Sequence, residues 1–351
     1  MRKKWLLLIP AILIILYLIG PSPATPVYKQ EMPVVPAAPA ALETYIRDNE
    51  ALHKLKTDNE ARIVWTNDSL KQKTDYAIVY LHGFSASQGE GDPVHRYIAG
   101  KFGYNLYLSR LAEHGIDTAD AMVNLTADGL WETAKQALAI GQQLGRKVIL
   151  MGTSTGGTLA LQLAAAYPDA VAAVVLLSPN IVLFDPNAWL LNNHWGLQVA
   201  RLVLGSHYIE SNEDYGPLYR QYWYPKYRAE GAVALEELLE TTMNKETFSK
   251  VKQPVGLFYY YKDNIHQDST VKVSAALDMF DQLGTPADLK YKQAIPEAGT
   301  HVIGSSVRSH DVPGVEEGVM HFMTEVMRLK ALADSASIAA EGARSTKMSQ
   351  K

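Results

Sequence analysis

The chain of 351 residues carries a net charge of −4 at pH 7 and contains 47% hydrophobic and 20% charged residues. This length and composition allow one large α/β core with an inserted subdomain, and the acidic balance gives no basic surface for nucleic acid. The chain has no cysteine, which excludes disulfides, thiolate catalysis, zinc–thiolate sites and lipid attachment through a thiol.

The first twenty residues have the charge asymmetry of an exported protein's leader. Three basic residues, Arg2, Lys3 and Lys4, precede an apolar run from Trp5 to Ile19. We expect residues 1–20 to form an N-terminal membrane anchor or, alternatively, a cleaved signal segment. Both alternatives place the rest of the chain outside the cytoplasm, in the cell envelope or, after cleavage, in the periplasm or medium.

Residues 21–40 contain six prolines and predict an extended linker that does not pack. At the other end, residues 331–351 are small and polar, which predicts a flexible tail.

Between these segments, short apolar runs alternate with helical patterns. The expected strands are 61–66, 76–82, 104–108, 147–151, 171–177, 255–261 and 288–295, and the expected helices include 42–56, 129–144, 158–167 and 271–283. This alternation predicts an α/β domain over residues 41–330, with a mostly parallel central sheet and helices on both faces.

Residues 180–253 interrupt the alternation with helical and aromatic sequence and no convincing strand. They include Trp189, Trp195 and Trp223, half of the six tryptophans. The aromatic side chains either fill the core of a helical subdomain or line an apolar acyl pocket beneath a lid.

The segment Gly152-Thr153-Ser154-Thr155-Gly156-Gly157 is a Gly-x-Ser-x-Gly pattern between an apolar strand and an Ala/Leu-rich helix. Such a sharp turn holds a serine hydroxyl out of the backbone, where a base and a substrate carbonyl can both reach it. Ser154 is therefore the candidate nucleophile. The N–H of Thr155, at the positive end of the helix dipole, is a candidate oxyanion donor.

A serine nucleophile needs a histidine base and an acid that orients the base. His301 follows the last predicted strand in an exposed loop, whereas His310 and His321 come later, so His301 is the preferred base. The loop after residues 255–261 offers two acids, Asp263 and Asp268. We favour Asp268, which lies just before a short linker and a helix.

The turn after the strand 76–82 is expected to supply the second oxyanion donor. In His82-Gly83-Phe84, the N–H of Phe84 is the candidate. His82 and His114 are interpreted as structural residues that support this loop.

These motifs together resemble the α/β-hydrolase superfamily over about residues 62–330, closest to its carboxylesterase and monoacylglycerol-lipase-like serine hydrolases. The resemblance implies a Ser-His-Asp acyl-enzyme mechanism, ester substrates, no cofactor and a helical cap at residues 180–253. Thr153 departs from the histidine often found before the nucleophile, and the acid loop is longer than usual.

The sequence thus predicts an esterase or lipase-like enzyme that cleaves a small-molecule acyl ester, with a lipid-like acyl chain as the preferred substrate. An amide or thioester hydrolase with the same triad, or a non-catalytic binding member of the fold, is the alternative. No metal-ligand motif such as His-Glu-x-x-His is present in the sequence, so no metal is expected.

Overall fold

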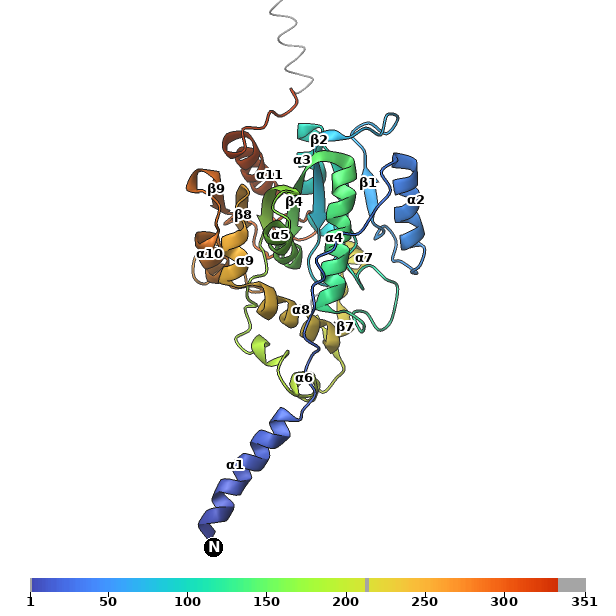
Figure 1. Ribbon diagram of the computed structural model, residues 1–351. Coiled ribbons are helices and arrows are strands. Elements are labelled where there is room, and N and C mark those ends of the chain that lie inside the picture. Colours follow the sequence, from blue (N-terminus) through green and yellow to red (C-terminus); the bar gives the residue numbers. More distant parts are fainter. Residues whose placement is uncertain (1, 212–214, 334–351) are drawn as a thin grey trace, which may run out of the picture.

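The computed structural model describes residues 2–211 and 215–333 (Figure 1). The predicted tail lies outside the described residues from position 334 onward. The helices are α1 Arg2–Leu18, α2 Pro39–Glu50, α3 Val94–Phe102, α4 Ala127–Leu144, α5 Thr155–Ala166, α6 Gly196–Leu204, α7 Pro217–Tyr222, α8 Ala229–Thr242, α9 Lys245–Lys250, α10 Val273–Gln282 and α11 Val312–His321. The strands are β1 Arg62–Val64, β2 Thr74–Leu81, β3 Asn105–Leu108, β4 Gly145–Thr153, β5 Val171–Leu177, β6 Tyr208–Glu210, β7 Lys226–Arg228, β8 Val255–Tyr259 and β9 Lys290–Ala294.

The centre of the molecule is a seven-stranded sheet with the order β1-β3-β2-β4-β5-β8-β9. Every neighbouring pair is parallel except β1 and β3, which are antiparallel at one edge. Because parallel strands need crossover connections, helices lie between them and cover the sheet. The predicted fold class, a mostly parallel sheet with helices on both faces, is confirmed.

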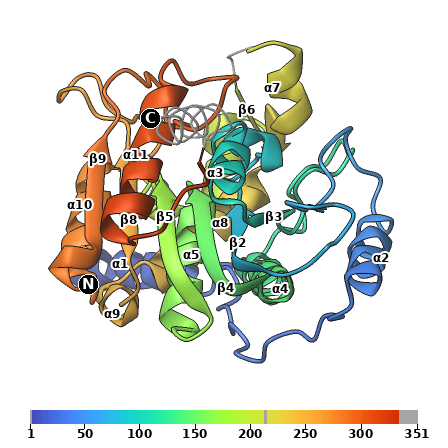
Figure 2. The same ribbon diagram turned by 90° about the horizontal axis from the view of Figure 1, so that it is seen from above.

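The two faces of the sheet bury separate hydrophobic clusters. Along β2, Ala77 and Val79 join the cluster that includes α4 and α5, whereas Ile78 and Tyr80 join the cluster that includes α3 and α11. This division follows from the alternation of side chains along a strand. Figure 2 shows α3 and α11 on one side of the sheet, with α4, α5 and α9 on the other. Burial on both faces leaves the strand ends as the places for polar chemistry.

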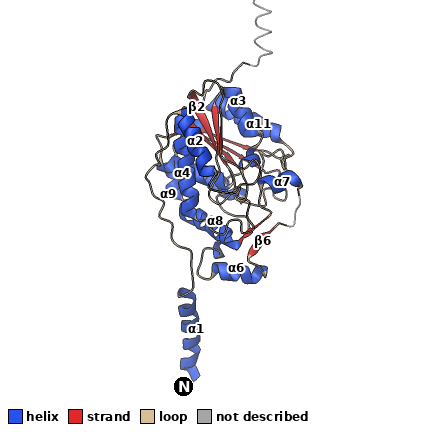
Figure 3. Ribbon diagram, turned by 90° about the vertical axis from the view of Figure 1, so that its right-hand side faces the viewer, coloured by secondary structure: helices blue, strands red, loops and turns tan. Residues whose placement is uncertain are grey.

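Residues 180–253, the segment expected to form a lid and called the lid below, follow β5 and contain α6, α7, α8 and α9 (Figure 3). The prediction that this segment has no strand is wrong, because β6 and β7 pair antiparallel, with Ile209 opposite Tyr227. Strands of only three residues are too short to show a two-residue hydrophobic period in the sequence.

Residues 21–37, between α1 and α2, contain neither helix nor strand, but they are in contact with the body. The N–H of Tyr28 donates to the Asp128 carboxylate on α4 over 3.0 Å, and the buried Lys135 ammonium donates to the carbonyl of Lys29 over 2.8 Å. The segment is therefore extended, as predicted, but the prediction that it does not pack is wrong, because it lies along α4. Helix α1 projects beyond the lid in Figure 1. In the described part of the chain, no helix combines the length and apolarity needed to cross a membrane.

Candidate active site

Ser154 lies in the turn between β4 and α5 with φ 53° and ψ −118°, a conformation that L-residues rarely adopt. Glycines make the turn possible. A β-carbon on Gly156 would collide with the Leu81 carbonyl oxygen, and one on Gly157 would lie 2.8 Å from Pro179 Cβ. Strain of this kind persists only where the surrounding packing enforces it. The turn holds Ser154 at the carboxyl end of β4, where its side chain lines a cavity.

His301 and Asp268 come from different loops and form one hydrogen-bonded pair. His301 follows β9 and Asp268 follows β8, and the distance from His301 Nδ1 to Asp268 Oδ2 is 2.6 Å. Asp268 is 1% exposed, and its other oxygen accepts the backbone N–H groups of Thr270 and Val271 over 2.8 and 3.1 Å. The carboxylate is thereby fixed, and it holds the proton of the imidazole on Nδ1.

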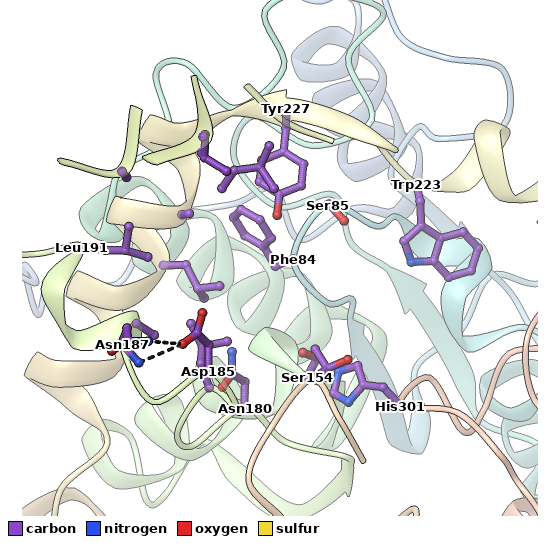
Figure 4. Close-up of a pocket in the computed structure, with 18 of the residues that line it drawn as sticks. Phe84, Ser85, Ser154, Asn180, Asp185, Asn187, Leu191, Trp223, Tyr227 and His301 are labelled. Atoms are coloured by element: carbon purple, nitrogen blue, oxygen red, sulfur yellow. Dashed lines mark hydrogen bonds between the residues drawn. The ribbon is translucent and has the colours of Figure 1, made fainter. Parts of the chain in front are cut away.

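With the proton on Nδ1, the Nε2 atom of His301 is free to accept a proton. Nε2 is buried and has no hydrogen-bond partner among the described residues, and both His301 and Ser154 line the same cavity (Figure 4). Burial alone lowers the pKa of His301, but the charge and hydrogen bond of Asp268, with a smaller contribution from Glu90, outweigh it and raise the pKa above its ordinary value. The geometry suits a general base oriented by a carboxylate.

Asp263, the alternative acid, faces away from this pair. Its carboxylate lies on the exposed part of the loop, 2.9 Å from His266 Nδ1, and accepts the N–H groups of Ile265 and His266. These hydrogen bonds lower the pKa of Asp263 to about 2. The structure thus brings Asp268 and not Asp263 to His301.

The candidate oxyanion donors lie at the ends of two adjacent parallel strands, β2 and β4. Thr155 is the first residue of α5, so its N–H has no acceptor within the helix. Among the hydrogen bonds of the described residues, none uses the N–H of Phe84. The neighbouring N–H of Gly83 is occupied, because it donates to Glu90 Oε2 over 2.6 Å.

His82 and His114 support the loop that carries Phe84. His82 is buried, its Nε2 accepts the N–H of Leu111 over 3.0 Å, and burial lowers its pKa to about 4. His114 Nε2 accepts the N–H of Ser85 over 3.1 Å. Both rings are therefore neutral parts of the hydrogen-bonded framework, in agreement with the structural role expected from the sequence.

The cavity has a volume of about 540 Å³ and lies between the sheet and the lid. Its wall on the lid side is mostly apolar and is formed by Leu183, Ala188, Leu190, Leu191, Val199, Ala200, Val203, Leu204, Ile209, Tyr219, Trp223, Tyr227, Ala232 and Leu235, together with Asn180, Asp185, Asn187 and Gly196. In Figure 4, Tyr227 on β7 points toward Phe84, and their ring centroids are 5.1 Å apart. A cavity of this size and polarity suits an apolar acyl group beside Ser154.

Among the cavity residues that the sequence analysis did not name are two charged ones outside the lid, Glu90 and Arg308. Glu90 is 2% exposed and belongs to a short 3₁₀ turn, Gln88–Gly91. The guanidinium of Arg308 lies 3.4 Å from the Tyr215 ring centroid. Neither residue belongs to a motif, because their positions depend on how distant loops fold back over the sheet.

No arrangement that suits a metal ion was found in residues 2–211 and 215–333, where at least three His, Cys, Asp or Glu side chains would have to converge. The expectation from the sequence that the site needs no metal stays a prediction.

Comparisons with known proteins agree with this architecture. Residues 76–299 match the family model described as the alpha/beta hydrolase fold. The match covers more than half of the chain, so the protein belongs to the α/β-hydrolase fold family. A search of curated protein sequences found no match.

Three solved structures illustrate the likeness. A structure from the study of LipS and LipT, two metagenome-derived lipolytic enzymes, has a TM-score of 0.61 at 16% identity and covers 78% of this chain and 100% of its own. The monoacylglycerol lipase of Paleococcus ferrophilus has a TM-score of 0.56 at 14% identity, with 75% and 97% coverage. Est1E of Butyrivibrio proteoclasticus with ferulic acid has a TM-score of 0.50 at 17% identity, with 77% and 95% coverage. At these identities the likeness establishes the fold.

Proposed function

We propose that the protein is a serine hydrolase that cleaves carboxylic esters. The observation that carries the proposal is the buried Asp268–His301 pair. Its histidine has no hydrogen-bond partner on Nε2 among the described residues and lines the same cavity as the strained Ser154. A nucleophile, a base and an orienting acid in this arrangement are the parts that acyl transfer requires.

In the proposed reaction, Ser154 Oγ attacks the ester carbonyl carbon while its proton passes to His301 Nε2. The N–H groups of Phe84 and Thr155 stabilise the negative oxygen of the tetrahedral intermediate. His301 then protonates the leaving alcohol as the C–O bond breaks, which leaves an acyl group on Ser154. A water molecule, deprotonated by His301, hydrolyses this acyl-enzyme and restores the serine.

The apolar lid wall supports a substrate with a medium-length or lipid-like acyl chain. Two of the similar structures are described as a lipolytic enzyme and a monoacylglycerol lipase, which also supports a lipid-like acyl substrate. An extracytoplasmic location, with residues 1–20 as an anchor or a leader, is proposed from the sequence alone. A fusion of residues 1–40 to alkaline phosphatase, which is active only outside the cytoplasm, tests that location.

The test of the proposed function is hydrolysis of p-nitrophenyl esters of graded chain length by the full chain and by Ser154→Ala. We expect turnover to peak at a definite chain length and to fall by about 10³-fold or more in Ser154→Ala. Equal turnover by the two proteins would contradict the proposal.

A further inference from the structure

Glu90 is a buried acidic residue in the candidate site that the reaction above does not use. It lines the cavity together with Ser154 and His301 and is 2% exposed. Among the ion pairs of residues 2–211 and 215–333, none includes Glu90. Burial raises the pKa of its carboxyl to about 7, although the Gly83 N–H and the charge of His301 oppose this rise. An unpaired buried acid is destabilising unless its hydrogen bonds compensate, so its contacts indicate what it does.

The carboxyl of Glu90 connects the two loops that carry the candidate oxyanion donors. Its Oε2 accepts the N–H of Gly83 over 2.6 Å and lies 3.4 Å from the hydroxyl of Tyr80. The Tyr80 hydroxyl is in turn 3.0 Å from Thr153 Oγ1. Gly83 directly precedes Phe84, and Thr153 directly precedes the Ser154-Thr155 turn. One buried hydrogen-bonded chain therefore joins both halves of the proposed oxyanion hole.

The packing around Gly83 leaves no room for a side chain at this turn. A β-carbon on Gly83 would lie 2.8 Å from Glu90 Oε1 and 3.1 Å from Ser154 Cβ. Glu90 thus contacts the oxyanion loop on the side that faces Ser154.

We infer that Glu90 is a positioning residue, which holds the Gly83–Phe84 turn so that the N–H of Phe84 points at the developing oxyanion. This inference rests on the proposed function. It also gives a role to Thr153, the residue at which the sequence departs from the pattern of its family, because the Thr153 hydroxyl anchors the far end of the hydrogen-bonded chain.

Glu90 also acts on His301 through its charge. When ionised it raises the pKa of His301, so its neutralisation lowers that pKa. The side chains that act on the Glu90 carboxyl are Tyr80 on β2 and Trp223, through hydrogen bonds, and His301 after β9, through its charge. Asp92 and His95 act on or pack against Tyr80, and Arg308 acts on His301. Replacement of Glu90 by glutamine removes the negative charge and leaves the others in place. The acid limb of kcat/KM is then expected to move to lower pH.

The experiment compares Glu90→Ala, Glu90→Asp and Glu90→Gln in the full chain. Glutamine retains an oxygen that can accept the Gly83 N–H, whereas aspartate keeps the charge but withdraws the acceptor by one methylene. The readouts are kcat and KM for a p-nitrophenyl ester, the inhibition constant of an alkyl boronic acid, which forms a tetrahedral adduct on serine, and the pH profile. Glu236→Gln is the matched control, because Glu236 on α8 is also buried and has a pKa raised to about 7, but does not line the cavity.

We expect Glu90→Ala and Glu90→Asp to lower kcat by about 10- to 100-fold, somewhat less than the loss of a whole oxyanion donor. The boronic acid is expected to bind more weakly by a similar factor, while KM changes by less than about threefold. Glu90→Gln should retain most of kcat and show the shifted acid limb, and Glu236→Gln should change neither.

Two outcomes would overturn the inference. One is a folded Glu90→Asp or Glu90→Ala with wild-type kcat and boronic acid affinity, and the other is a Glu90→Gln that loses as much as Glu90→Asp. If Glu90→Ala does not fold, the comparison of aspartate with glutamine carries the test. Reaction of the wild-type chain with a fluorophosphonate is measured alongside, because its absence would count against the proposed hydrolase and not against the role of Glu90.

Discussion

The carboxyl edge of the central sheet and the lid that covers it differ in how firmly they hold their side chains. Ser154 and Asp268 are 6% and 1% exposed and follow strands buried on both faces. On α6 of the lid, Leu202 and Val203 are 83% and 80% exposed. Close packing on two sides fixes reacting groups within the narrow tolerances that catalysis needs. The part of the lid that includes α6 is more exposed, lines the cavity and is expected to tolerate change, whereas α8 of the lid is largely buried.

The comparison predicts that substitutions at the sheet edge act on the chemical step. Asp268→Asn should lower kcat by about 10³- to 10⁴-fold, because the asparagine amide no longer holds the proton of His301 on Nδ1. Asp263→Asn, five residues away on the exposed part of the same loop, should change kcat by less than about threefold. Steady-state kinetics on one p-nitrophenyl ester measures both. A large loss in Asp263→Asn alone would reverse the assignment of the acid.

Substitutions in the lid are expected to change which substrate is preferred. Leu191 lines the cavity (Figure 4), so the larger side chain of Leu191→Trp should shorten the space for the acyl chain. We expect kcat/KM for long esters to fall about tenfold relative to short esters, because each lost methylene contact is worth about 0.8 kcal/mol.

Leu202→Trp is the control for adding a large side chain to the lid without filling the cavity, because Leu202 is exposed and does not line the cavity. It should leave the chain-length profile unchanged. A loss of activity on short and long esters alike in Leu191→Trp would mean that the lid takes part in the chemistry, contrary to the comparison.

The smallest expected effect concerns pH. His301 accepts a proton only in its neutral form, and its pKa is raised by Asp268, so kcat/KM should fall as the pH drops through a value above about 6.5, the ordinary histidine pKa. Leu191→Trp should leave this acid limb in place because the lid residue does not contact the pair. An acid limb below the ordinary value in the wild type would show that burial, not Asp268, dominates His301.

The strands and the turn at Ser154 could be predicted from the sequence because they are marked by patterns among neighbouring residues. Apolar runs such as 171–177 coincide with β5, and the glycines around Ser154 mark the turn, because both features depend on neighbouring residues. His301 was named because it follows the last predicted strand, and Asp268 was preferred to Asp263 because it precedes a short linker and a helix. Their catalytic roles, like those of Phe84 and Thr155, stay predictions until kinetics test them.

What the sequence did not reveal depends on contacts between distant segments. Glu90 reaches Gly83 only because the chain folds back through a 3₁₀ turn, and no spacing pattern marks such a return. The packing of residues 21–37 along α4 relies largely on backbone N–H and carbonyl groups, which nearly every residue possesses. The pairing of β6 with β7 likewise joins two three-residue segments that are separated in the chain by α7.

The central claim is that Ser154 is a nucleophile activated by His301. The most direct measurement is mass spectrometry of the full chain after reaction with a fluorophosphonate, with proteolysis to locate the adduct. We expect one adduct per chain, on the peptide that contains Ser154, with labelling lost in Ser154→Ala and strongly slowed in His301→Ala. A folded protein that takes up no label, or an adduct on another residue, would contradict the account.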